Sequence, residues 1–210
     1  MSVQVMVVGH TLRYEAATEL ARQVNGGLSI DDGTLGTYGN HRRALLAGAE
    51  SGASHVCILE DDAVPVEDFR THIERAAEIR PNDLTGLYVG QSRPMPAFVA
   101  DAVRRADEAG ASWLHSLHLM WGVGYLVPSH AVPALIKKAD ARVNTPQADT
   151  RIGRAWRASQ GRPIYYTWPS LVDHADGPSI TDEHDQRAPG RVAHRVGVPN
   201  WSNRVVDTRT

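Results

Sequence analysis

The sequence has little cysteine, little lysine and no long apolar run. Its single cysteine, Cys57, lies within the apolar segment 56–59 and has no partner for an internal disulfide, so we expect a reduced core residue. No stretch reaches the roughly 18–20 consecutive apolar residues that a membrane-spanning helix needs, and no basic segment followed by an apolar one opens the chain. We therefore expect a cytoplasmic protein.

The sequence also lacks an excess of charge of either sign, because 22 basic and 24 acidic residues leave a formal net charge of only −2. This balance argues against a protein that holds nucleic acid by overall positive charge. Lys137 and Lys138 are the only lysines, so nearly all of the basic residues are arginine. The planar guanidinium suits phosphate, although a GC-rich genome would produce the same bias.

The length and pattern of the chain predict one α/β domain. With 210 residues, 42% of them hydrophobic, the chain can bury one sizeable core. The first 60 residues predict a strand at 3–8, a helix at 13–24, a strand at 28–30, a helix ending at 51–52 and a strand at 55–59. This alternation implies right-handed crossovers, and therefore a Rossmann-like, mostly parallel sheet flanked by helices.

The later elements are predicted from shorter patterns. They are a helix from about Phe69 that ends at Arg80-Pro81, a strand at 84–89, a helix to about 109, strands at 113–120 and 121–127 separated by a bend or bulge, a helix after Ser129, a helix at 149–159 and a strand at 164–168. Ser129 is expected to cap its helix, with Pro133 tolerated in the first turn.

The C-terminal segment differs in composition from the rest of the chain. The final 24 residues contain five arginines and one acid. We predict that 1–175 form the main domain, and that 176–210 form an arginine-rich arm or wrap rather than an independent domain.

The acidic triplet Glu60-Asp61-Asp62 directly follows the predicted strand at 55–59. Open α/β sheets bind their ligands at the carboxyl ends of such strands. Adjacent carboxylates repel one another unless a cation lies between them, and hard oxygen ligands suit Mg²⁺ or Mn²⁺, which also bind substrate phosphates. The triplet therefore predicts a metal–diphosphate site; the alternative is a solvated acidic turn after a strand.

Three segments carry a family resemblance: 38–45, 48–52 and 55–64, the last containing Leu59-Glu60-Asp61-Asp62. They resemble the family-25 glycosyltransferases, which include lipooligosaccharide and collagen galactosyltransferases and have the GT-A fold. That family shows a Ser-His pair before the Leu-Glu-Asp-Asp strand, whereas Asn40-His41 stands here. Segments 121–129, 146–149 and 165–174 resemble the family's Gly-x-x-Gly-Tyr strand, its Pro-x-Asp segment and its closing Pro-x-Leu-Val segment.

The resemblance implies roles for the triplet as a DXD-like motif. Glu60 would contact the donor's ribose, Asp62 would bind Mn²⁺ or Mg²⁺ directly, and Asp61 would support the donor site through further hydrogen bonds. His174 would complete the metal shell, with a surface histidine in an acidic loop as the alternative.

A nucleotide-sugar donor, with UDP favoured, would lie across the end of the first strand. Glycine there would let the backbone approach the ligand. The predicted donor contacts are Val8, Gly9, His10, Thr11, Arg13, Asp31, Asp32, Asn40 and Arg43. The alternative is that Gly9 only ends a strand and that 31–33 form a tight turn.

Sugar transfer also needs a base that removes the acceptor's proton. Asp149 is predicted to be this base, and the alternative is a helix N-cap. The expected activity is therefore a hexosyltransferase acting on a glycan or on hydroxymethylated DNA, the latter requiring base extrusion and arginine contacts to phosphate. A metal-dependent phosphohydrolase or nuclease, drawing further ligands from 174–185, and a non-catalytic nucleotide-sugar-binding module remain open.

Overall fold

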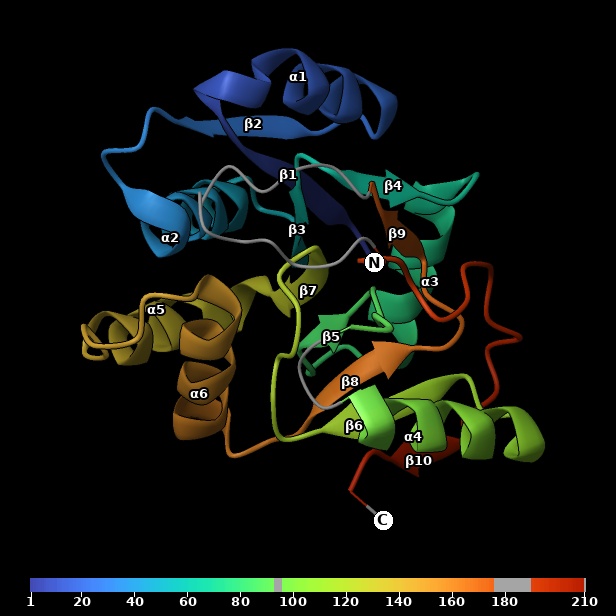
Figure 1. The fold of residues 1–210 in the computed structure, drawn as a ribbon. Coiled ribbons are helices and arrows are strands. Elements are labelled where there is room, and N and C mark those ends of the chain that lie inside the picture. Colours follow the sequence, from blue (N-terminus) through green and yellow to red (C-terminus); the bar gives the residue numbers. More distant parts are fainter. Residues whose placement is uncertain (93–95, 176–189, 210) are drawn as a thin grey trace.

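The first three strands are parallel neighbours in a central eight-stranded sheet (Figure 1). The structure is a computed structural model that describes residues 1–92, 96–175 and 190–209. The elements here are β1 (Val3–His10), α1 (Tyr14–Gln23), β2 (Gly27–Asp31), α2 (Gly36–Glu50) and β3 (His55–Glu60). They confirm the strands and helices predicted for the first 60 residues.

The order of these strands determines where the two connecting helices lie. Strand β1 pairs with β2 on one side and with β3 on the other, so the chain reverses direction across the sheet after β2. Because both crossovers are between parallel strands, right-handed connections place α1 and α2 on opposite faces. Two parallel strands at this reversal therefore end side by side, with Val8 beside Glu60 in the pairing register.

The second half of the sheet mixes both strand directions. The order across the sheet is β10-β6-β8-β5-β7-β3-β1-β2. Among the described residues, four strand pairings in this sheet are parallel and three are antiparallel. The added strands are β5 (Thr85–Gly86), β6 (Trp113–Ser116), β7 (Gly124–Pro128), β8 (Ile164–Thr167) and β10 (Val205–Asp207). The predicted α/β class with a mostly parallel central sheet is thereby confirmed.

Helices cover the sheet from both sides (Figure 1). The helices α5 and α6 pack against each other and against α2, whereas α3 packs against β1 and β7. These elements are α3 (Phe69–Ile79), α4 (Pro96–Ala109), α5 (Val132–Asp140) and α6 (Ala148–Gln160), with short 3-10 turns η1 (Thr11–Arg13) and η2 (Ser129–Ala131). No helix in the described ranges is long and apolar enough to cross a bilayer.

A small antiparallel ribbon lies beside the acidic triplet. Its strands are β4 (Ala63–Pro65) and β9 (Val172–His174), and Ala63 pairs with His174. The backbone N–H of Ala175 also donates to the carbonyl of Asp62 at 2.8 Å. The ribbon therefore brings the end of the closing segment back to Asp62, the last residue of the triplet.

Three details of the predicted elements are wrong. The strand expected at 84–89 is only Thr85–Gly86, and the two separate strands expected at 113–120 and 121–127 are present but shorter, with an irregular segment in place of a bend or bulge between them. The irregular segment is held by a side chain rather than by strand pairing. The Tyr166 hydroxyl accepts from the Met120 N–H and donates to the His118 carbonyl, both at 2.7 Å. Ser129 opens a 3-10 turn instead of capping α5, and its buried hydroxyl has no hydrogen-bond partner in the described part of the chain.

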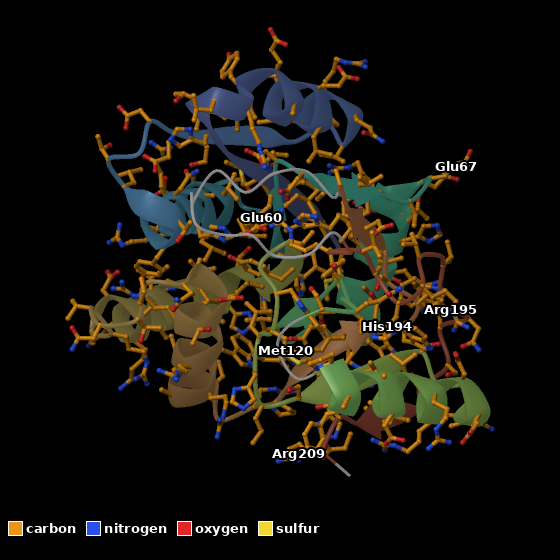
Figure 2. The ribbon with its side chains drawn as sticks, viewed as in Figure 1. Glu60, Glu67, Met120, His194, Arg195 and Arg209 are labelled. Atoms are coloured by element: carbon orange, nitrogen blue, oxygen red, sulfur yellow. The ribbon has the colours of Figure 1, made fainter. Side chains whose placement is uncertain are left out.

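The described part of the arginine-rich segment packs along the domain. Strand β10 extends the central sheet by pairing with β6, while Arg195 and Arg209 form ion pairs with Asp107 and Asp207 at 2.6 Å. Figure 2 shows both arginines well away from Glu60. Residues 176–189 of the predicted arm lie outside the described residues.

Helix α6 packs tightly against the irregular segment at Gly153, so a larger residue there should destabilise the protein. A Cβ at Gly153 would lie 2.7 Å from the Leu119 backbone nitrogen. Alanine in place of glycine stabilises a helix by about 0.5–1 kcal/mol through its higher helix propensity. Overpacking, however, costs about 1–3 kcal/mol, and the contact here is with backbone, which moves less easily than a flexible side chain. Gly153→Ala should therefore lower the free energy of unfolding by about 1–2 kcal/mol in urea titrations.

The matched control is Arg154→Ala, an exposed position on the same helix, which should change stability by less than about 0.5 kcal/mol. A Gly153→Ala protein as stable as the parent would contradict the close packing of α6.

Candidate functional site

The acidic triplet lies where two parallel strands end at a reversal of strand order. Glu60 ends β3, and Asp61 and Asp62 follow it directly, beside the Gly9-His10 end of β1. Crevices of this kind, outside the carboxyl ends of strands whose connections leave on opposite faces, are where open α/β sheets bind ligands. The triplet is therefore placed as the sequence predicted.

Arg13 is paired with two of the three carboxylates. Its Nη1 lies 3.0 Å from Oδ1 of Asp61 and 2.7 Å from Oδ2 of Asp62. The other oxygen of Asp61 accepts from the backbone N–H of His10 at 3.2 Å. Burial and the charge of Asp62 raise the pKa of Asp61 despite these favourable partners. Positive charge at the triplet thus comes from Arg13, one of the predicted donor contacts.

A glycine permits the close approach of β1 to the triplet. A Cβ on Gly9 would lie 2.8 Å from the Cβ of Ala17 and 3.1 Å from Oδ2 of Asp61. Any side chain at this position would therefore push the strand end away from either α1 or the carboxylate.

Glu60 has a different partner, the buried His41 on α2. Nε2 of His41 lies 3.5 Å from Oε1 of Glu60, and its Nδ1 lies 2.9 Å from the hydroxyl of Tyr125. Burial opposes the charged form of Glu60, but the hydrogen bond and charge of His41 outweigh it, so the pKa of Glu60 is lowered. Gly122 leaves room for this carboxylate, since a Cβ there would lie 2.6 Å from Oε1.

No sequence pattern predicts a role for His41 or Tyr125. Both residues lie in the segments that carry the family resemblance, and this was the one signal available for them. Their contact joins α2 to β7, and the other ring nitrogen of His41 faces Glu60.

Asp62 and His174, the two predicted metal ligands, lie together. Oδ2 of Asp62 is 3.4 Å from Nε2 of His174, whose side chain is only 7% exposed. Oδ1 of Asp62 and Nδ1 of His174 are buried without a hydrogen-bond partner among the described residues. His174 belongs to strand β9 itself, rather than to the loop after a strand.

These two side chains fit a divalent ion that takes the rest of its shell from phosphate and water. Within 1–92, 96–175 and 190–209, no group of three or more histidine, cysteine, aspartate or glutamate side chains is arranged to hold a metal ion. A metal at this site would therefore depend on oxygens that the donor brings.

Asp149 lies in the first turn of α6, close enough to the triplet to be influenced by it. Burial, and then the charge of Glu60, raise its pKa against the opposing hydrogen bonds from Thr150 and the charge of His41. The N-cap residue of α6 is Gln147, so Asp149 is not the N-cap. A carboxylate with a raised pKa is suited to accepting a proton.

The predicted donor residues after β2 have partners within the chain. Asp31 accepts from the backbone N–H groups of Leu35 and Gly36 at 3.0 and 3.1 Å and holds the start of α2. Asp32 is exposed, and hydrogen bonds from Thr34 lower its pKa. Asp32 is therefore the more accessible of the two acids for a ribose or a base.

Asn40 and Arg43 also bond to the chain. Asn40 donates to the carbonyls of Gly9 and Ser29, both at 2.9 Å. Arg43 donates to the hydroxyl of Ser29 at 2.9 Å and to the carbonyl of Ile30 at 2.6 Å. These bonds fasten α2 to the ends of β1 and β2 and support the site; donor contact by either residue stays a prediction.

The other predicted donor residues surround the end of β1. Val8 is buried, His10 is partly exposed and Thr11 is exposed. Nδ1 of His10 accepts from the backbone N–H of Leu12 at 3.1 Å, which shapes the turn into η1.

A hollow of about 370 Å³ lies elsewhere on the surface, beside Trp168, Asp107 and Arg195. Its polar groups bond to one another, since Oδ1 of Asp107 accepts from Trp168 at 2.8 Å and from Arg195 at 2.6 Å. This mutual pairing makes the hollow a poorer candidate than the triplet, whose buried Asp62 Oδ1 lacks a partner among the described residues.

Comparisons with known proteins leave the family open. No family model and no curated protein sequence matches the chain, so family 25 is not confirmed. Three similar solved structures are mannose-1-phosphate geranyltransferase from Thermus thermophilus, a protein from STIV and a glycosyltransferase involved in the glycosylation of the major capsid of PBCV-1.

These likenesses are distant. The geranyltransferase has a TM-score of 0.40 and 10% identity over 80% of this chain and 74% of its own. The STIV protein has a TM-score of 0.45 and 11% identity over 81% of this chain and 85% of its own. The PBCV-1 glycosyltransferase has a TM-score of 0.38 and 8% identity over 76% of each chain. Scores this low carry no argument about activity. The chain's own α/β architecture is consistent with a Rossmann-like GT-A fold.

Because the pKa of Asp149 is raised, the stability of the protein should depend on pH through this residue. An acid whose pKa is higher folded than unfolded destabilises the native state above its folded pKa, and this penalty disappears below the unfolded value of about 3.9. Asp149→Asn should therefore be more stable than the parent at pH 7, and the difference should shrink as the pH falls through the raised folded pKa and be lost below about 4.

Urea titrations at both pH values measure this difference. Asp101→Asn is the control, because hydrogen bonds from Arg104 and Arg105 lower the pKa of Asp101 and its removal should give no gain at neutral pH. A loss of stability in Asp149→Asn that is equal at both pH values would contradict the prediction.

Proposed function

We propose that the chain is a glycosyltransferase that moves a sugar from a nucleotide sugar, with UDP-sugars favoured, to a hydroxyl acceptor. The observation that carries the proposal is the convergence of acids and bases at the ends of β1 and β3. Glu60, Asp61 and Asp62 meet His41, Arg13 and His174 there. Such a set suits a diphosphate with a divalent ion at a strand-reversal crevice.

The donor's phosphates would lie against the backbone from Gly9 to Thr11 and against Arg13. Glu60, kept charged by His41, would accept hydrogen bonds from ribose hydroxyls, and Asp32 would contact the base or ribose. Asp62 and His174 would hold Mn²⁺ or Mg²⁺, which when bound stabilises the negative charge of the departing diphosphate.

Transfer forms a bond between the acceptor oxygen and the sugar's anomeric carbon and breaks the bond from that carbon to the diphosphate. The proton of the acceptor hydroxyl goes to the carboxylate of Asp149, whose pKa is raised by burial. Asp149 is also influenced by the charge of Glu60, which fits a position beside the donor.

A carbohydrate hydroxyl is the acceptor that we favour, and hydroxymethylated DNA is the other. Arg195, Arg204 and Arg209 bond to Asp107, the Ala109 carbonyl and Asp207 within the chain, which engages them away from a DNA backbone. Duplex DNA binding that weakens steeply with salt would point to the DNA acceptor.

Thermal stabilisation by nucleotide sugars tests donor binding. A UDP-sugar at about 100 times its Kd should stabilise the folded state by about 2.7 kcal/mol when Mn²⁺ is present, and less without it. Asp62→Asn should remove most of the Mn²⁺-dependent part, whereas Asp101→Asn, an exposed acid on α4, should respond as the parent does. If no nucleotide sugar raises the melting temperature with metal present, the proposal fails.

The same panel separates binding from chemistry. Asp149→Asn should keep the stabilisation by the donor, while donor hydrolysis or sugar transfer falls by about a hundredfold or more. Turnover equal to that of the parent would exclude Asp149 as the base. Donor binding by a parent protein without any turnover would indicate a binding module.

A further inference from the structure

One guanidinium lies against both carboxylates that a metal ion would approach. Nη1 of Arg13 is 3.0 Å from Asp61 and 2.7 Å from Asp62, and the three side chains are only 19%, 8% and 16% exposed. A single nitrogen that bridges two partly buried acids compensates their mutual repulsion without any ion. The ligand-free site therefore contains its own counter-charge.

The position of Arg13 conflicts with a bound divalent ion. The same Oδ2 of Asp62 that accepts from Arg13 is 3.4 Å from Nε2 of His174, the second proposed ligand. An ion held between Asp62 and His174 would come close to the guanidinium, and like charges repel strongly in a site shielded from water. Oδ1 of Asp62 and Nδ1 of His174, both buried, have no hydrogen-bond partner in the described ranges.

We propose that Arg13 competes with the metal: its guanidinium blocks binding of a divalent cation alone to the triplet. It leaves the carboxylates only when the cation binds together with a diphosphate. This inference rests on the proposed function and adds the order of assembly to it. Phosphate oxygens give the displaced guanidinium a new partner that matches its planar geometry. Metal and nucleotide then bind with positive cooperativity, since each removes an obstacle to the other.

The position of Arg13 in the chain suits this exchange. It ends the short turn η1 that leaves β1, directly beside the Gly9-to-Thr11 backbone where the donor's phosphates are proposed to lie. A shift of its side chain from the carboxylates to those phosphates needs no rearrangement of the strands that hold the triplet.

Binding of Mn²⁺ alone, measured by calorimetry without nucleotide, tests the inference. Arg13→Gln should bind Mn²⁺ roughly tenfold to a hundredfold more tightly than the parent, because the competing charge is gone. Arg13→Lys, which keeps the charge, should stay within a few-fold of the parent. An affinity for Mn²⁺ in Arg13→Gln no higher than in the parent would overturn the inference.

Two further variants keep the test decisive. Combining R13Q with D62N should abolish the gain, and a gain that survives would place the ion elsewhere and overturn the inference. If R13Q does not fold, Arg13→Met keeps the apolar stem, and the same rise in Mn²⁺ affinity is required of it.

The proposed function is tested separately, by nucleotide-sugar stabilisation of the parent. A parent stabilised by a UDP-sugar with Mn²⁺, together with unchanged Mn²⁺ affinity in R13Q, would reject only the role of Arg13. Tighter Mn²⁺ binding in R13Q with no nucleotide-sugar response in the parent would reject the transferase and the joint binding of cation and diphosphate, and would leave Arg13 as a competitor of the metal.

Discussion

Repulsion among three consecutive carboxylates is the constraint on which the site depends. Of the three, only Glu60 belongs to β3, and the chain turns at Asp61 and Asp62, so the three side chains reach different elements. Glu60 meets His41 on α2, whereas Asp61 meets Arg13 and the His10 backbone at the end of β1. Because β1 leads to α1 and β2 to α2 on opposite faces, Glu60 has a partner separate from those of the two aspartates, which share Arg13.

This arrangement divides the acids by charge environment. The partners of Glu60 lower its pKa, whereas burial dominates at Asp61 and Asp149 and raises theirs. Burying a charged carboxylate away from water lowers the free energy of unfolding, and such groups occur mainly at functional sites. The contrast between a stabilised anion at Glu60 and a destabilised one at Asp149 suits a donor contact and a base respectively.

The sequence was sufficient where local patterns are strong. The apolar runs predicted β1 and β3, and the position of the triplet after β3 followed from them. By contrast β4 and β10, each three residues long, have no periodicity and exist only through pairing with β9 and β6. Local propensity cannot predict strands whose stability comes from distant partners.

The candidate site shows the same division. Asp62 and His174 were predicted as a pair, and the β4–β9 ribbon brings them to 3.4 Å. Arg13 was predicted as a donor contact, and it bonds to acids 48 and 49 residues away, a pairing that no sequence spacing indicates. Asn40 was expected to contact the donor, yet its amide joins the strands beneath the site, because a buried polar group must find partners.

The central claim is that the ends of β1 and β3 bind the donor's diphosphate, and a crystal structure grown with UDP and Mn²⁺ tests it most directly. We predict diphosphate density between the Gly9-to-Arg13 turn and Asp62, with the ion on Asp62 and His174 and the Arg13 guanidinium turned to phosphate. Nucleotide density at the hollow beside Trp168 and Arg195, with Arg13 still bonded to Asp61 and Asp62, would contradict the account.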